Sequence, residues 1–163
     1  MISDKMQKEL NDQINAEIFS SYLYLSMAAY CESEDWHGFA AWMRIQSGEE
    51  YGHAMKIFKY VIEVEGKVSL EAIEKPKSVW ESPKQAFEEA HKHELYITDR
   101  IHKLVTLAMQ EKDYATNLFL NYFVNEQVEE VSTVSQIVHK FNLVGDNKTS
   151  IFLLDRELGV RAK

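Results

Sequence analysis

Four glutamates and one histidine of the 163-residue sequence recur at helical spacing, which makes them candidate metal ligands. Glu50 and His53 are three residues apart, and side chains at that separation share one face of a helix. Glu17, Glu94 and Glu130 each interrupt another stretch in which apolar residues return at alternating three- and four-residue steps. An isolated carboxylate withdrawn from water costs several kcal/mol or takes up a proton. Four such interruptions of apolar stripes therefore call for a shared chemical explanation.

Four long helices must position these side chains. The apolar periodicity predicts helices over about 4–32, 36–65, 83–111 and 114–142, and a shorter fifth helix over about 148–158. Few residues join the first helix to the second or the third to the fourth, so each pair is expected to form an antiparallel hairpin. The long connection 66–82 can extend to at most about 56 Å, whereas a helix of 29 residues is roughly 43 Å long.

This connection can therefore run the whole length of the bundle and return the chain to the end from which it started. The predicted fold is all-α: a four-helix bundle, made of two antiparallel hairpins joined by a long crossover, plus a short C-terminal fifth helix. We expect one domain over 1–163, with the bundle over about 4–142. Asp35, Ser82 and Asp113 precede predicted helices and are expected to cap them.

The heights of the glutamates along the bundle place them in one layer. With the first and fourth helices rising and the other two descending, a rise of 1.5 Å per residue puts Glu17, Glu50, Glu130 and Glu94 at about 20, 22, 24 and 26 Å. Four carboxylates in one layer repel one another, and two divalent cations would balance their charge. Oxygen ligands with one imidazole suit iron or manganese better than structural zinc.

A second acidic group borders this layer. Glu49 adjoins Glu50, and the fourth helix carries Glu126 and Glu129 beside Glu130. These side chains are expected to bind a third cation as it enters or leaves the pair, although a solvated acidic helix face would have the same composition.

The pattern resembles the ferroxidase centre of bacterial-type non-haem ferritins, and the resemblance extends over essentially the whole chain. The residues that carry it are Glu17, Glu50, His53, Glu94 and the run Glu126-Gln127-Val128-Glu129-Glu130. The resemblance implies that Glu17, Glu50 and His53 bind one iron. It implies that Glu50 bridges to a second iron, which Glu94 and Glu130 also bind, with Gln127 as a weak contact beside it.

Further positions carry over from the same family. Glu49, Glu126, Glu129 and Glu130 match a third iron site, and Tyr24 matches a tyrosine beside the dinuclear centre, although core packing would also place a tyrosine there. Haem is not expected. In the haem-binding branch a methionine follows the bridging glutamate and a second Glu-x-x-His is present, whereas this chain has Tyr51 and Gln127-x-x-Glu130.

The function that the resemblance implies is iron storage. Two Fe(II) ions bind the dinuclear centre and pass electrons to dioxygen, which makes the protein a ferroxidase, and Fe(III) moves on to a mineral core. The family stores that core in a hollow homo-oligomeric cage of 24 subunits. The apolar residues of the fifth helix (Ile151, Phe152, Leu154 and Leu158) are expected to need partners beyond the completed bundle, which favours association.

Composition excludes several classes of partner. A net charge of −8 argues against a nucleic-acid partner, and it favours the attraction of cations. The longest apolar stretch, Ile18 to Cys31, is too short to span a bilayer, and no secretory signal precedes it. We therefore expect a cytoplasmic protein without a membrane partner.

Two alternatives to the storage cage stay open at this point. A di-iron or di-manganese carboxylate oxidase without a cage would have the same metal site in a small oligomer. A metal-free helical interaction module would leave Glu50 and His53 as an exposed ion pair on one helix.

Overall fold

The computed structural model describes residues 2–161, which contain five helices and no strand. The helices are α1 (Asp4–Ser33), α2 (His37–Glu63), α3 (Pro83–Glu111), α4 (Tyr114–Val144) and α5 (Lys148–Gly159). Their ends differ from the predicted ends by at most two residues, and the all-α fold is confirmed. Among the residues described, no helix is both long and apolar enough to cross a membrane.

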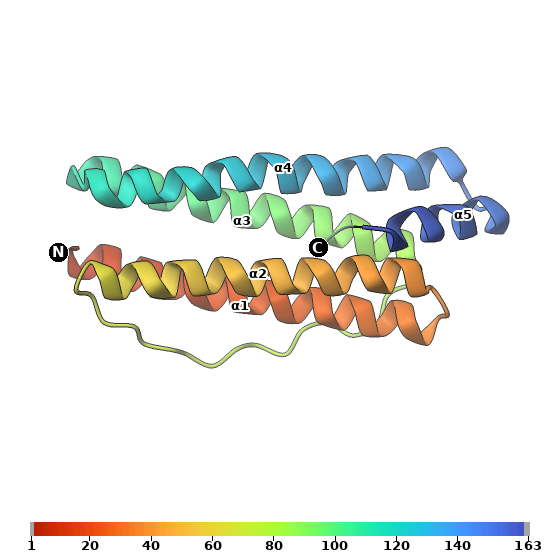
Figure 1. Ribbon diagram of the computed structural model, residues 1–163, viewed down its shortest axis with the longest axis horizontal. Helices are drawn as coiled ribbons and strands as arrows, with labels where there is room; N and C mark the ends of the chain where they lie inside the picture. The colour runs from red at the N-terminus through yellow and green to blue at the C-terminus, as the bar shows by residue number, and fades with distance from the viewer. Residues whose placement is uncertain (1, 162–163) are drawn as a thin grey trace.

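Figure 1 shows the two helical hairpins side by side, with the connection between α2 and α3 running the length of the bundle beside α1 and α2. Side chains of α1 hold this crossover in place. Asn11 donates to the carbonyl of Lys67 at 2.9 Å and accepts from the backbone N–H of Ser69 at 2.9 Å, and one turn later Asn15 donates to the carbonyl of Ala72 at 3.1 Å. These hydrogen bonds fix the backbone of the crossover against α1.

Two of the three predicted helix caps are confirmed. The side chains of Ser82 and Asp113 accept backbone N–H groups in the first turns of α3 and α4, at 3.1 and 3.0 Å. The expectation for Asp35 is wrong, since this residue adopts a left-handed conformation with φ of 62° in the turn before α2. The backbone N–H of Phe39, in the first turn of α2, instead donates at 2.8 Å to the carboxylate of Asp155 on α5.

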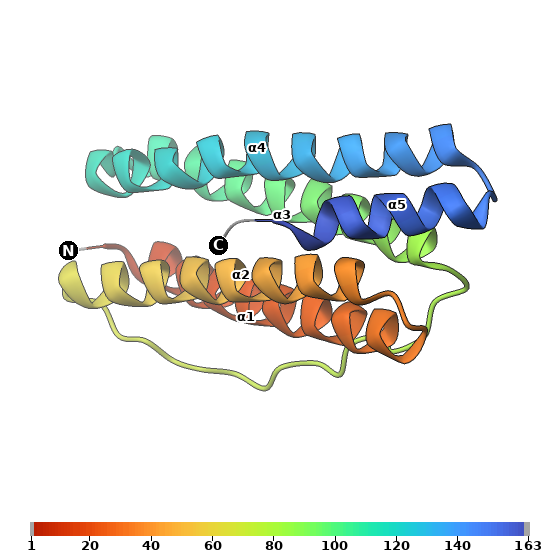
Figure 2. The same cartoon turned by 45° about the vertical axis from the view of Figure 1, so that its right-hand side comes forward.

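Helix α5 packs on the start of α2, between α2 and α4 (Figure 2). The two backbones come very close: a Cβ atom on Gly38 would stand 1.8 Å from the carbonyl oxygen of Asp155, and one on Gly159 would stand 3.0 Å from Gly38. Leu154 and Leu158 are buried in the chain's own core, so the expectation that they need partners outside the bundle is wrong.

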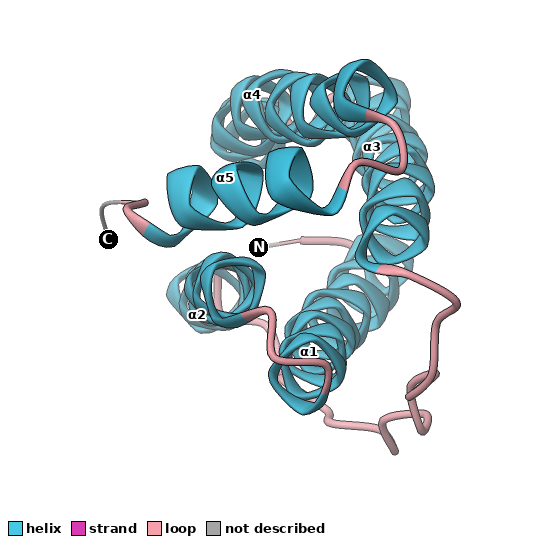
Figure 3. Cartoon of the chain, turned by 90° about the vertical axis from the view of Figure 1, so that its right-hand side faces the viewer, coloured by secondary structure: helices cyan, strands magenta, loops and turns pink. Residues whose placement is uncertain are grey.

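Two apolar cores fill the ends of the bundle, whose four long helices are seen end-on in Figure 3. The core near the fifth helix includes Met27, Phe39, Phe87 and Phe141. The core at the opposite end includes Leu10, Ile57, Ile101 and Phe123. Between the two cores each long helix contributes buried polar side chains, which create a polar layer at mid-height.

Candidate metal centre

The polar layer contains all five predicted ligands of the dinuclear site. Glu17 comes from α1, Glu50 and His53 from α2, Glu94 from α3 and Glu130 from α4, and each is buried, with 1 to 8% of its surface exposed. The apolar stripes that they interrupt are the same stripes that build the two cores. Helical periodicity therefore aims these side chains inward, and packing holds them away from water.

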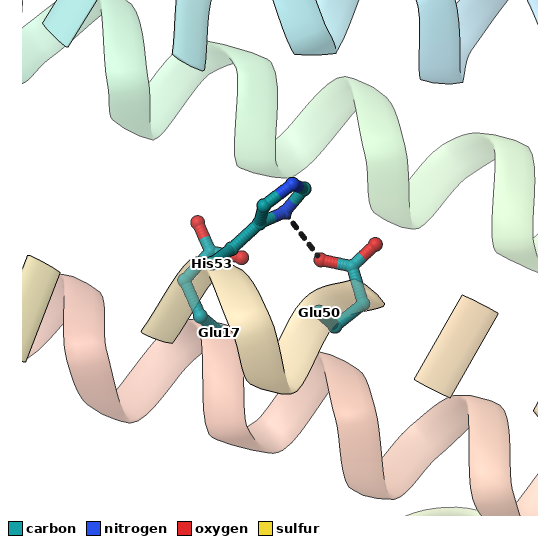
Figure 4. Close-up of side chains that lie close together, drawn as sticks. All are labelled: Glu17, Glu50 and His53. Carbon is teal, nitrogen blue, oxygen red and sulfur yellow. Dashed lines mark hydrogen bonds and ion pairs between the residues drawn. The ribbon is translucent and has the colours of Figure 1, made fainter. Parts of the chain in front are cut away.

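Two groups of three ligand atoms form within the layer. One atom each of Glu17, Glu50 and His53 lies within 4.8 Å of the others, and the same holds for Glu50, Glu94 and Glu130. Figure 4 shows the first group, in which the three side chains extend from α1 and α2 toward the space beside α3. Glu50 belongs to both groups, the position that a carboxylate bridging two ions would occupy.

Amide side chains donate to the carboxylates. Gln46, one turn before Glu50, donates to Glu50 at 2.7 Å and to Glu130 at 3.1 Å. Gln127 donates at 3.2 Å to both the backbone carbonyl and the carboxylate of Glu94. Gln127 thus contacts the centre by donating to Glu94 through its amide nitrogen. Sequence reasoning did not single out Gln46, yet its spacing of four residues before Glu50 was a usable signal.

Two carboxylate oxygens have no donor. Glu17 Oε2 and Glu130 Oε2 are buried and lack a hydrogen-bond partner among the described residues. Buried polar atoms almost always have a partner, because an unpaired one costs the full desolvation penalty of the group. Glu17 belongs to the first group of three ligands and Glu130 to the second, so the donor set fits a pair of cations, each completing one orphaned carboxylate.

Burial and mutual repulsion raise the pKa values of the glutamates in the metal-free protein. Loss of solvation is the main cause for all four carboxyls, and neighbouring carboxylates add to it at Glu50, Glu94 and Glu130. The pKa of Glu130 rises to about 10. Without metal the layer therefore holds protons at neutral pH, and a bound cation must displace them.

The two nitrogens of His53 face different groups. Nδ1 lies 3.4 Å from Glu50 and 4.0 Å from Glu130, whereas Nε2 lies 3.6 Å from Glu126. His53, Glu126 and Glu130 form a third group with ligand atoms within 4.8 Å of one another. The imidazole thus stands between the dinuclear layer and the predicted third site, a role for His53 that sequence reasoning missed.

The other two residues predicted for the third site stand apart. Glu49 and Glu129 line the same cavity of about 550 Å³ as Glu126 and Glu130, but neither joins a group of three ligands among residues 2–161. Glu49 instead pairs with Arg161 at 2.7 Å. Arg161 follows α5 at the end of the chain, and nothing in the local sequence signals its contact with α2.

Comparisons with known proteins agree with this architecture. A family model described as a ferritin-like domain matches residues 7–144. The bacterial non-heme ferritin of Bacteroides fragilis is 44% identical over 161 residues, which cover 99% of this chain and 100% of that protein. A bacterial non-heme ferritin of Staphylococcus aureus is 37% identical, over 99% of this chain and 97% of its own. A solved open pore ferritin from the hyperthermophilic archaeon Archaeoglobus fulgidus is similar with a TM-score of 0.98 and 52% identity, over 99% of this chain and 100% of that one.

Proposed function

The chain belongs to the ferritin family, and on this premise we propose that it oxidises Fe(II) with dioxygen at the centre in its polar layer and stores the Fe(III) as a mineral. The observation that carries the proposal is the meeting of four buried glutamates from four helices with two orphaned carboxylate oxygens among them. An interaction module or a purely structural bundle would gain nothing from burying four carboxylates, which costs free energy of folding.

Iron is the substrate in this proposal. Glu17, Glu50 and His53 bind the first Fe(II). Glu94 and Glu130 bind the second, and Glu50 bridges the two. Four carboxylates and two divalent ions cancel in charge, which offsets the loss of solvation and the repulsion that together keep the layer protonated in the metal-free protein. Each ion gives one electron to dioxygen, which with two protons is reduced to hydrogen peroxide, and the protein supplies the geometry and the charge balance.

Side chains around the ligands keep them in place. Tyr24 and Gln127 both donate to Glu94, and Gln46 donates to Glu50 and Glu130. Hydrogen bonds of this kind orient carboxylate ligands and tune their basicity. We assign Tyr24, Gln46 and Gln127 to positioning the ligands.

Oxidised iron leaves through the third group. His53 Nε2, Glu126 and Glu130 take an ion from the dinuclear layer, and the cavity lined by Glu49 and Glu129 carries it onward. Because Glu130 belongs to both the second and third groups, an ion can move between them without losing that ligand.

Storage also needs an enclosure, for which we propose a homo-oligomeric cage of 24 subunits. Exposed apolar residues support association: Tyr22 and Leu25 on α1, Leu70 and Val79 on the crossover, and Phe152 and Leu153 on α5. Size-exclusion chromatography with electron microscopy after aerobic iron loading tests this proposal. A large hollow particle with an electron-dense centre is expected. A dimer of the 19.0 kDa chain that oxidises iron would favour the oxidase without a cage.

A further inference from the structure

Gln13, on α1 one turn before Glu17, is completely buried, and both ends of its amide are engaged. Its nitrogen donates to Glu17 Oε1 at 2.8 Å. Its oxygen accepts from Nε of Arg100, on α3, at 2.9 Å. The three side chains thus form one continuous hydrogen-bonded chain, from the guanidinium through the amide to the carboxylate.

The guanidinium determines which way the amide faces. An arginine can only donate hydrogen bonds, so it must contact the amide oxygen and not the nitrogen. With its oxygen held by Arg100, Gln13 presents its NH2 group to Glu17. The opposite orientation would set the amide oxygen against a carboxylate oxygen and leave the guanidinium without its acceptor, so Arg100 disfavours it.

Arg100 is itself held in position. Its Nη1 donates to the hydroxyl of Tyr96 at 3.3 Å, and its guanidinium carbon lies 5.8 Å from the centre of the Tyr96 ring. It lines a surface cavity between α1, α3 and the crossover, together with Asp12 and Glu71. The chain of hydrogen bonds therefore begins at the surface of the molecule and ends at the metal centre.

This chain of hydrogen bonds acts on the first group of three candidate ligands, which are Glu17, Glu50 and His53. The donor from Gln13 occupies Glu17 Oε1, whereas Glu17 Oε2 has no partner within residues 2–161 and stays available to a cation. The remaining glutamates of the layer have donors of their own, since Glu50 and Glu130 accept from Gln46 and Glu94 accepts from Gln127. Arg100 is therefore linked to one group of ligands only.

We propose that Arg100 is a positioning residue for the metal bound by Glu17, Glu50 and His53, and that it acts through Gln13 by fixing the amide orientation that holds Glu17. This inference rests on the proposed function, because it assumes that the buried layer binds metal. It adds a residue at the surface, outside the ligand set, as a determinant of affinity at one of the two ions.

A double-mutant cycle tests the proposal. The variants are R100M, which keeps the straight chain and removes the donors, Q13L, and the two combined. K103M is the matched control, since Lys103 is an exposed cation on the same helix that pairs with Asp99. The measurements are anaerobic titration with Co(II) by calorimetry and the initial rate of Fe(II) oxidation against Fe(II) concentration, with helix content checked by circular dichroism.

We expect R100M to weaken one of the two Co(II) binding steps about tenfold, the size of effect typical of residues that orient metal ligands. KM for Fe(II) should rise more than kcat falls. R100M should add nothing in the Q13L background, R100K should recover part of the loss, and K103M should match the wild type.

Wild-type affinity in R100M, or an equal loss from R100M with and without Gln13, would overturn the inference while leaving the metal centre intact. Weakening of both binding steps in R100M would also overturn it, because the contact would then be a general structural one. Absence of Co(II) binding in the wild-type protein would instead overturn the proposed function itself. If R100M does not fold, R100K and Q13L carry the same test, with Q13L expected to weaken the same single step.

Discussion

The hydroxyl of Tyr24 on α1 donates a hydrogen bond to the carboxylate of Glu94 on α3, and so joins the two helical hairpins across the polar layer. Both side chains are buried. Burial and the charge of Glu94 raise the pKa of Tyr24 well above its ordinary value, so the phenol stays protonated and remains a donor at neutral pH. The bond also satisfies the buried hydroxyl, so only a measurement on the metal centre separates a positioning role from core packing.

The Y24F variant tests the bond. Phenylalanine keeps the ring and removes the donor, so Glu94 should bind metal less well while the surrounding core stays packed. We expect about tenfold weaker binding of the second Co(II) and slower Fe(II) oxidation, measured by calorimetry and stopped-flow absorbance, with unchanged helix content. If Co(II) affinity and the rate of Fe(II) oxidation are both unchanged in Y24F, Tyr24 is only a core residue.

Removal of the shared ligand and the imidazole should abolish rapid oxidation. Glu50 belongs to both ligand groups and His53 supplies the nitrogen to the first, so E50A combined with H53A damages both metal positions. We expect loss of the fast phase of aerobic Fe(II) oxidation with little change in helix content by circular dichroism. An initial rate equal to the wild-type rate would rule out the dinuclear assignment.

Metal removal should leave the helices folded, because the carboxylates can take up protons instead. Since burial raises the pKa values of Glu50 and Glu130, the folded state holds more protons than the unfolded state between their ordinary pKa and the raised values. The metal-free protein should therefore lose stability as pH rises from 6 toward the pKa of Glu130 at about 10, by about 1.4 kcal/mol per pH unit for each proton held.

Urea denaturation of the metal-free protein at several pH values from 6 to 9 measures this slope. Saturating Zn(II), which replaces the protons, should flatten it. E50Q combined with E130Q, which keeps the shape of the side chains and removes two of the four titrating groups, should make the slope smaller. A free energy of unfolding that increases with pH over this range in the metal-free protein would contradict the protonated layer, as would a collapse of helix content on chelation.

The docking of α5 depends on Gly38. A methyl group there would clash with the backbone carbonyl of Asp155, which cannot move without displacing α5. We expect G38A to destabilise the protein by about 1–3 kcal/mol and to speed hydrogen exchange in α5. G48A is the matched control: it lies in the same helix with nothing within 4 Å of the new methyl group, so it should stabilise the protein by about 0.5–1 kcal/mol.

The fold and the positions of the five central candidate ligands were accessible from sequence because both follow from one periodicity. The spacing that buries Leu10 and Ile57 also buries Glu17 and Glu50, and the length of the crossover orients the hairpins. Contacts made by α5 were not accessible in the same way. Asp155 accepts the N–H of Phe39 in place of Asp35 because Gly38 and Gly159 let the backbones of α2 and α5 approach each other. The spacing of residues along the sequence does not reveal that approach.

The third group illustrates the same limit. Glu126 on α4 lies close to His53 on α2, whereas Glu49, adjacent to a candidate ligand in sequence, pairs with Arg161. Adjacent residues on a helix point about 100° apart, so neighbourhood in sequence is a weak guide to neighbourhood at a site. The donors Gln13 and Gln46 stand four residues before Glu17 and Glu50, a spacing that does predict contact.

Anomalous diffraction at the iron edge, from crystals soaked anaerobically in Fe(II), is the most direct measurement of the buried centre. Two peaks are expected inside each bundle, one among Glu17, Glu50 and His53 and one among Glu50, Glu94 and Glu130. Peaks confined to the outer surface, with the bundle interior empty at saturating Fe(II), would contradict the assignment of these glutamates to a pair of iron ions.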